Sequence, residues 1–346
     1  MEKSHKTDKK PAIKVIGIDS FGANIVNRMI ERDVDTIECI AVSTDYGALR
    51  ESRAQTKILI GFGSFLKSQI DCFNEIDRYA YQKIQESLQG AALVIFVGDL
   101  SFSEPVSAAM IVAAAREMGI PIIGITCVRM LKEGRNLISQ VNENAQKLCQ
   151  QLVSLLVLSR NLLDRSIVMP LNSGILDMCR NMDVQVVDAV SGFIQLVSQG
   201  TKEKHAPHYQ GLAAMGVGTA SGAKRAGEAA ARAASSPLLA GHNISRARVA
   251  LVFIRSSAEI TPVEIAAIRG QISDSIQKGG TVLTEVLADG KLGNELRVSV
   301  LFTGVGDTHD VVLSEPYLED DADSHSGWDF RPEYSHADTY FDIFGV

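Results

Sequence analysis

Residues 92–106 read Ala92-Leu93-Val94-Ile95-Phe96-Val97-Gly98-Asp99-Leu100-Ser101-Phe102-Ser103-Glu104-Pro105-Val106. The uninterrupted apolar run at 92–97 predicts a strand that is buried on both faces, because half-exposed strands alternate apolar and polar residues. The stretch that follows contains a single glycine, Gly98. Backbone amides approach a phosphate closely only where side chains are absent and positive φ is allowed. This stretch is therefore poorly suited to hold a phosphate, although its position after a buried strand calls for a phosphate loop.

Similar apolar runs alternate with helical patterns through the first half of the chain. They lie at residues 13–17, 39–42, 57–60, 120–126 and 153–158. This alternation predicts a parallel sheet that helices cover on both faces. The ligand site of such a sheet lies at the carboxyl ends of its strands.

A long helical pattern follows at 173–198, and a second unit comes after it. The second unit is expected to hold an alanine-rich helix after Ser221-Gly222, a helix that starts at Pro262, and strands at 249–254, 282–287 and 296–303. The predicted fold class is α/β: a Rossmann-like parallel-sheet domain, a long central helix and a second α/β domain.

The composition is that of a soluble globular protein. The chain has 346 residues, of which 46% are hydrophobic and 22% charged, so it can bury a sizeable core over two domains. No apolar run is long enough to cross a bilayer and residues 1–10 are polar, which predicts a cytoplasmic protein without membrane insertion. The five cysteines include no Cys-x-x-Cys pair, so neither a disulfide framework nor a metal site is expected.

The negative charge belongs to the end of the chain. Residues 307–346 carry eleven Asp or Glu against one Arg, a net charge of -10, which leaves +3 for residues 1–306. This segment is expected to be a disordered acidic arm, and its charge argues against a nucleic-acid partner. Four large apolar residues end it: Tyr340, Phe341, Ile343 and Phe344. They predict either a peptide that docks on a partner or a strand that folds back onto the protein itself.

Several stretches, in this order, resemble the bacterial cell-division family FtsZ of the tubulin superfamily, over residues 12 to about 306. They are Ile13-Lys14-Val15-Ile16-Gly17, Asn24 with Val26-Asn27-Arg28-Met29-Ile30, Ile40-Ala41-Val42-Ser43-Thr44-Asp45, Ala220-Ser221-Gly222, Ser235-Ser236-Pro237-Leu238-Leu239, and Glu295-Leu296-Arg297-Val298-Ser299-Val300 with Thr303-Gly304. The resemblance implies a GTP-binding domain, a core helix and a carboxyl-terminal domain. It also implies head-to-tail filaments in which each subunit completes the GTPase site of its neighbour.

The resemblance also sets the expected boundaries. An amino-terminal tail spans residues 1–11 and a Rossmann-like, degenerate GTP-binding domain spans 12–172. The central helix and a shortened catalytic-type loop span 173–210, the FtsZ-like carboxyl-terminal domain spans 211–306, and the acidic tail spans 307–346. Residues that match the family's nucleotide contacts are Gly17, Gly22, Asn24, Thr44, Asp45, Glu133 and Arg135.

The chain departs from the family where the chemistry resides. Asp19 would place a negative charge where phosphate belongs, a Coulomb penalty that is hard to offset without a metal. The third loop, at 69–76, lacks glycine, and the family's glycine signature aligns with 100–106, where every glycine is lost. The Asp that reads guanine aligns with Val184, with Asp183 displaced by one position. The loop between Val197 and Gly211 is about ten residues shorter and keeps Glu203 as its only carboxylate.

These losses predict a divergent FtsZ-like structural or interaction protein that forms or modulates filaments without hydrolysing GTP. No catalytic residue, metal or resident cofactor is expected, and weak GTP or GDP binding stays open. Its expected partners are copies of itself, or a conventional FtsZ or another protein that binds the tail. The alternative is a working FtsZ GTPase in bacterial cell division, in which Lys67 or Arg129 replaces backbone amides. A dinucleotide oxidoreductase is disfavoured because the first loop lacks the Gly-x-Gly turn.

Overall fold

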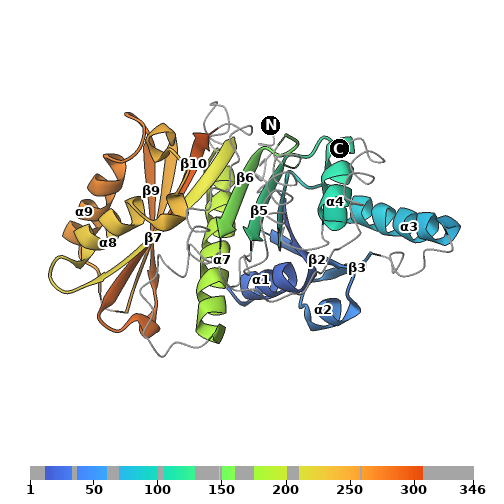
Figure 1. Ribbon diagram of the computed structural model, residues 1–346, viewed down its shortest axis with the longest axis horizontal. Helices are drawn as coiled ribbons and strands as arrows, with labels where there is room; N and C mark the ends of the chain where they lie inside the picture. The colour runs from blue at the N-terminus through green and yellow to red at the C-terminus, as the bar shows by residue number, and fades with distance from the viewer. Residues whose placement is uncertain are drawn as a thin grey trace, which may run out of the picture.

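One continuous sheet runs through the whole body of the protein. The computed structural model describes residues 12–32, 37–60, 70–99, 105–128, 148, 150–159, 175–200, 210–257 and 259–306. In these residues ten strands join in the order β3-β2-β1-β4-β5-β6-β7-β10-β8-β9. Figure 1 shows β2 and β3 toward one end of the molecule and β7 and β9 toward the other. The two expected α/β units therefore share a single sheet.

The first half of the sheet is parallel, as predicted. Its strands are β1 (Ile13–Ile18), β2 (Ile37–Ser43), β3 (Thr56–Leu59), β4 (Leu93–Asp99), β5 (Ile122–Val128) and β6 (Ser154–Ser159). The helices between them are α1 (Asp19–Glu31), α2 (Tyr46–Glu51), α3 (Ile70–Leu88) and α4 (Pro105–Glu117). Since these strands are parallel, the ends of β1, β2 and β4 meet at one edge of the sheet.

The second half is a mixed sheet. Its strands are β7 (Gly211–Ser221), β8 (Val249–Ser256), β9 (Thr281–Ala288) and β10 (Glu295–Gly306), and its helices are α8 (Arg225–Ala234) and α9 (Pro262–Ser273). β10 pairs antiparallel with both β7 and β8, whereas β9 pairs parallel with β8. Strands β8 to β10 and both helices confirm the sequence predictions.

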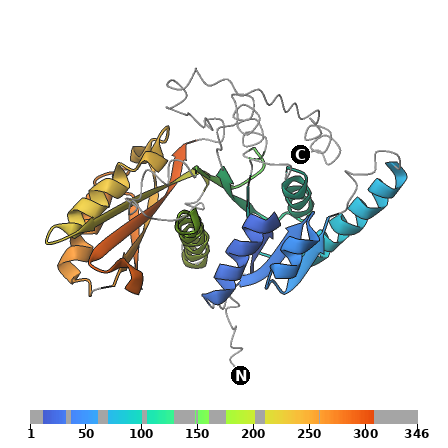
Figure 2. The ribbon, with the colours of Figure 1, turned by 60° about the horizontal axis from the view of Figure 1, so that its bottom comes forward.

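Helices cover both faces of the sheet. Two hydrophobic clusters lie on opposite faces, one with α1, α2 and α7 (Ile175–Gly200) and the other with α3, α4, α8 and α9. Figure 2 shows α7, the predicted central helix, between the two halves. The helix comes close to the second half at Gly192, where a Cβ atom would lie 3.0 Å from Leu301 Cδ2.

Strand β7 is an element that the sequence did not predict. Its residues are mostly Gly and Ala, which are depleted in strands. The packing explains them, because a Cβ on Gly216 or Gly218 would collide with the carbonyl oxygen of Ala233 or Ala229 in α8. The small residues of β7 thus let the alanine-rich helix α8 lie directly on the strand.

Two expected loops differ from the prediction. The stretch expected as a glycine-poor loop at 69–76 is helical from Ile70 onward, as the start of α3. The stretch at 98–106 is divided between β4, which extends to Asp99, and α4, which begins at Pro105.

No helix among the described residues is long and apolar enough to cross a membrane.

Candidate functional site

The first residue of α1, Asp19, occupies the edge where β1 and β2 end. Its side chain is buried, and its Oδ1 accepts hydrogen bonds from Ser43 Oγ at 2.5 Å and from the backbone N–H of Thr44 at 3.1 Å. Its φ is 53°, and within the described segments it is the only residue other than glycine with positive φ. Since this backbone conformation is strained for a residue with a side chain, the surrounding contacts must hold it.

The carboxylate of Asp19 lies at the carboxyl edge of the parallel sheet, at the N-terminus of α1. Free backbone N–H groups at the carboxyl edge of a parallel sheet, beside a helix N-terminus, are the usual donors to phosphate. Here the N–H of Thr44 already donates to a protein carboxylate. A phosphate brought to this edge would lose that donor and would meet a negative charge.

The loop after β2 is also organised by internal bonds. Ser43 Oγ accepts from the backbone N–H of Asp45 at 2.9 Å while it donates to Asp19. Asp45 Oδ1 accepts from the N–H of Gly47 at 2.8 Å, so Asp45 is the N-cap of α2. The family-matching residues Thr44 and Asp45 are thus brought next to Asp19, and both already have partners in the protein.

Gly17 and Gly22 are both needed for packing. A Cβ on Gly22 would collide with the carbonyl oxygen of Val97 in β4, and a Cβ on Gly17 would collide with the carbonyl oxygen of Gly22. The first turn of α1 therefore lies directly on β1 and β4. Close helix–strand packing accounts for these two glycines without a ligand.

Asn24 and the displaced Asp183 do meet, but Arg28 joins them. Asn24 Nδ2 donates to Asp183 Oδ2 at 3.0 Å, and Arg28 Nη2 lies 2.7 Å from the same oxygen. The Asp183 side chain is 7% exposed, so this ion pair is largely shielded from water. Val184, which aligns with the guanine-reading position, carries no group that could accept a hydrogen bond from a base.

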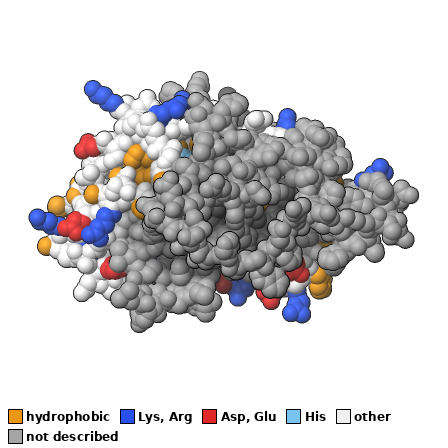
Figure 3. Space-filling view, viewed as in Figure 1, with side chains coloured by type: hydrophobic (Ala, Val, Ile, Leu, Met, Phe, Trp, Pro, Cys, Tyr) orange, Lys and Arg blue, Asp and Glu red, His pale blue; other side chains and the backbone are white. Residues whose placement is uncertain are grey.

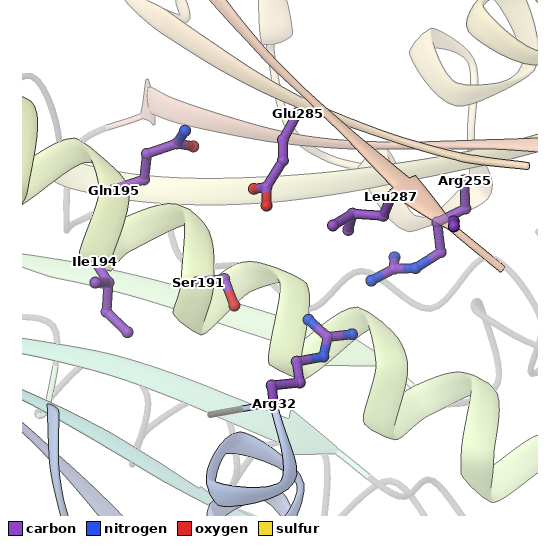
Figure 4. A pocket seen from close by; sticks show the side chains of 8 residues that line it. Arg32, Ser191, Ile194, Gln195, Arg255, Glu285 and Leu287 are labelled. Carbon is purple, nitrogen blue, oxygen red and sulfur yellow. The ribbon is translucent and has the colours of Figure 1, made fainter. Parts of the chain in front are cut away.

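A second acid on α7, Asp188, joins three elements. Its fully buried carboxylate accepts hydrogen bonds from Arg255 of β8 on both oxygens. Arg32, the residue that follows α1, places its Nη1 atom 3.3 Å from Asp188 Oδ1. Figure 4 shows that Arg32, Arg255 and Glu285 point toward a common space beside α7. This space is a cavity of about 490 Å³ between α7 and the β8–β9 pair.

The sequence did not identify Arg28, Arg32 or Asp188 as partners. Asn24, Arg28 and Arg32 recur every fourth residue along α1, which places them on one face of that helix. On α7, the corresponding signal in the sequence was the presence of acidic residues in a largely apolar helical pattern. The pairing itself could not be seen, because it depends on how α1 crosses α7.

Several predicted residues lie outside the described part of the chain. These are Glu133 and Arg135 of the ribose and base region, Glu203 of the short loop, and the tail residues Tyr340, Phe341, Ile343 and Phe344. Among the residues that the structure describes, no group of three or more His, Cys, Asp or Glu could hold a metal ion. Cys39 and Cys127 are buried free thiols, as expected for small apolar residues.

Comparison with known protein families finds a match in the second half. Residues 211–306 match the family model for the C-terminal domain of the FtsZ family. The chain is 28% identical to the cell division protein FtsZ of Pseudomonas aeruginosa over 306 residues, which cover 85% of this chain and 77% of that protein. It is 27% identical to FtsZ of Coxiella burnetii over 308 residues, which cover 85% and 79% of the two chains.

Solved structures share the fold. An empty FtsZ dimer of M. jannaschii matches with a TM-score of 0.67 and 22% identity, over 88% of this chain and 92% of that one. A GTPγS-bound protofilament of CetZ2 from Haloferax volcanii matches with a TM-score of 0.55 and 15% identity, over 85% and 93%. At these identities the likeness concerns the fold.

Proposed function

We propose that this chain is a member of the FtsZ/tubulin superfamily and a cytoskeletal protein that associates with copies of itself while its own side chains fill its nucleotide site. It binds GTP or GDP weakly at most and does not hydrolyse GTP. Its role is structural: it forms filaments or modulates those of a conventional FtsZ.

The contact between Asp19 and Thr44 carries this proposal. It supplies from within the protein both the anion and the hydrogen-bond acceptor that a phosphate would otherwise bring. Phosphate contacts are charge-assisted hydrogen bonds worth about 1.5 to 3 kcal/mol each. Losing one such donor and adding a repulsive carboxylate therefore weakens nucleotide binding at least tenfold, since about 1.4 kcal/mol is a factor of ten.

The base side of the site supports the same proposal. A carboxylate that reads guanine must be free to accept from the base, whereas Asp183 is held by Asn24 and Arg28. A guanine that took this carboxylate would leave Arg28 without its partner. Glu133 and Arg135 are the remaining candidates for contacts to ribose and base.

Self-association is supported by the match of the second half to the family's C-terminal domain and by the structural relatives. The matched C-terminal domain covers residues 211–306, and the structural relatives include a dimer and a protofilament. Stretches that match the family persist in this half, whereas the first half lacks the family's glycine signature at residues 100–106. A tail that ends in Tyr340, Phe341, Ile343 and Phe344 offers a second contact to a partner protein.

Sedimentation with and without GTP, combined with a phosphate-release assay, tests the proposal on the full chain. We expect the same sedimented fraction in both conditions and no phosphate above the buffer blank. Assembly that depends on GTP, or phosphate release that scales with protein concentration, would overturn it.

A pair of variants tests the mechanism. Asp19→Gly removes the carboxylate, frees the Thr44 N–H and suits the positive φ, so GTP affinity should rise at least tenfold. Asp45→Asn is the matched control, because it removes the same charge from the neighbouring loop after β2 and keeps a residue that caps α2. If both variants raise the affinity equally, general charge repulsion rather than the Asp19 contact weakens binding.

A further inference from the structure

We propose that strand β9 pairs with β9 of a second copy across a two-fold axis, which joins two sheets edge to edge. This contact lies at the far end of the second half. It would be a lateral contact, independent of head-to-tail association and of the nucleotide site.

β9 is an edge strand without the usual protection. Within the described segments it pairs with β8 alone, and its sequence, Thr281 to Ala288, contains no Lys, Pro or Gly and one charge, Glu285. Natural edge strands are usually short or carry lysine, proline or a bulge that prevents pairing with another chain. The opposite edge strand, β3, has four residues and includes Lys57. The edge at β3 therefore has features that hinder pairing with another chain, whereas the edge at β9 lacks them.

An open apolar hollow lies on helix α9, which neighbours this edge. Pro262, Ile265, Ala266 and Arg269 of α9 line the hollow, which has a volume of about 480 Å³. Arg269 Nη2 donates to the carbonyl oxygen of Val282 at 3.4 Å, so this flank of α9 faces β9. Figure 3 shows hydrophobic side chains exposed between charged ones at this end of the molecule. Addition of a strand to an exposed sheet edge is a common mode of recognition.

Large apolar side chains are exposed on both β9 and α9. Val286 of β9 is 46% exposed, and Val263 of α9 is 79% exposed. A strand added to β9 would cover Val286 and remove apolar surface from water.

The sequence of β9 favours a second copy as the added strand. If the two-fold axis passes between the two Thr284 residues, Val282 lies opposite the partner's Val286 on the face that carries α9. Leu283 then lies opposite the partner's Glu285 on the other face. An axis at Glu285 would instead place two carboxylates directly opposite each other, which is destabilising. Charge thus disfavours the register centred on Glu285 and is compatible with the register centred on Thr284.

Thr284 gives independent support for this register. Its Oγ1 is buried and has no hydrogen-bond partner in the structure. A buried hydroxyl without a partner is costly, because it has lost its hydrogen bonds to water. At the two-fold axis the hydroxyl of the partner's Thr284 becomes available, and Thr–Thr pairs are favourable in antiparallel sheets.

Sedimentation velocity over a range of concentrations tests the contact. We expect Val286→Lys to raise the dissociation constant of the wild-type dimer at least tenfold. Leu59→Lys is the matched control, because Leu59 is 38% exposed on the other edge strand, and it should change the constant less than twofold. The proposal is overturned if the wild type stays monomeric, or if Val286→Lys dimerises as well as the control.

Disulfide trapping tests the register separately from other association. Under mild oxidation, Thr284→Cys should form a dimer resistant to SDS without reductant, at a level well above both the wild type and Glu285→Cys. Crosslinking that is equal for the two variants, or stronger for Glu285→Cys, contradicts the Thr284-centred pairing.

Discussion

Replacing Asp188 should lower the free energy of unfolding more than replacing its partly exposed partner Arg32. Asp188→Leu removes the carboxylate that accepts hydrogen bonds from Arg255, whose side chain is 6% exposed. Breaking a buried ion pair in this way costs about 3 to 5 kcal/mol. Arg32 is 34% exposed and can be hydrated instead, so Arg32→Ala should cost about 1 kcal/mol or less.

Equilibrium unfolding in urea, followed by circular dichroism, measures these differences. With a slope of about 3 kcal/mol per molar, a loss of about 3 to 5 kcal/mol moves the midpoint down by about 1 to 1.7 M. The double variant Asp188→Leu with Arg255→Met removes both buried charges and should recover most of the lost stability. The reasoning is refuted if Asp188→Leu costs less than about 1 kcal/mol, or if the double variant is less stable than Asp188→Leu alone.

The remaining predictions concern other parts of the fold. Gly22→Ala should cost about 3 kcal/mol or more in a thermal melt, because the new methyl group collides with the backbone of Val97, and an unchanged melt would contradict the packing. The partners Arg225 and Thr261 lower the pKa of Glu264 to about 2, so the stability that Glu264 contributes is complete above pH 4.5 and is lost as pH falls toward 2. Glu264→Gln should therefore cost about 1 to 2 kcal/mol at pH 7 and almost nothing near pH 2, as urea melts at the two pH values would show. Burial raises the pKa of the Cys39 thiol to about 11, so mass spectrometry after maleimide treatment at pH 7 should find Cys39 unlabelled in the native protein.

The sequence was sufficient for most of the fold. Continuous apolar runs predicted the parallel strands β1 to β6, because a strand buried on both faces needs no alternation. The start of α9 was readable from Thr261-Pro262, and the structure adds a complete capping box between Thr261 and Glu264. Both signals are local, so they survive without knowledge of the tertiary structure.

Non-local packing explains what the sequence did not reveal. β7 consists of small residues because α8 lies on it, and this reason is visible only when both elements are in place. The sequence predicted that Asp19 would place an anion in the first loop, but its partners Ser43 and Thr44 could not be predicted because they come from the neighbouring strand end. The ion pair between Arg28 and Asp183 likewise depends on how α1 crosses α7, two helices that are far apart in the chain.

The most direct test of the central claim is calorimetric titration of GTP with magnesium into the full chain. If internal side chains occupy the nucleotide site, the unaltered chain should give no saturable heat in the micromolar range. The Asp19→Gly variant should give saturable heat in that range. Micromolar binding by the unaltered chain would contradict the claim.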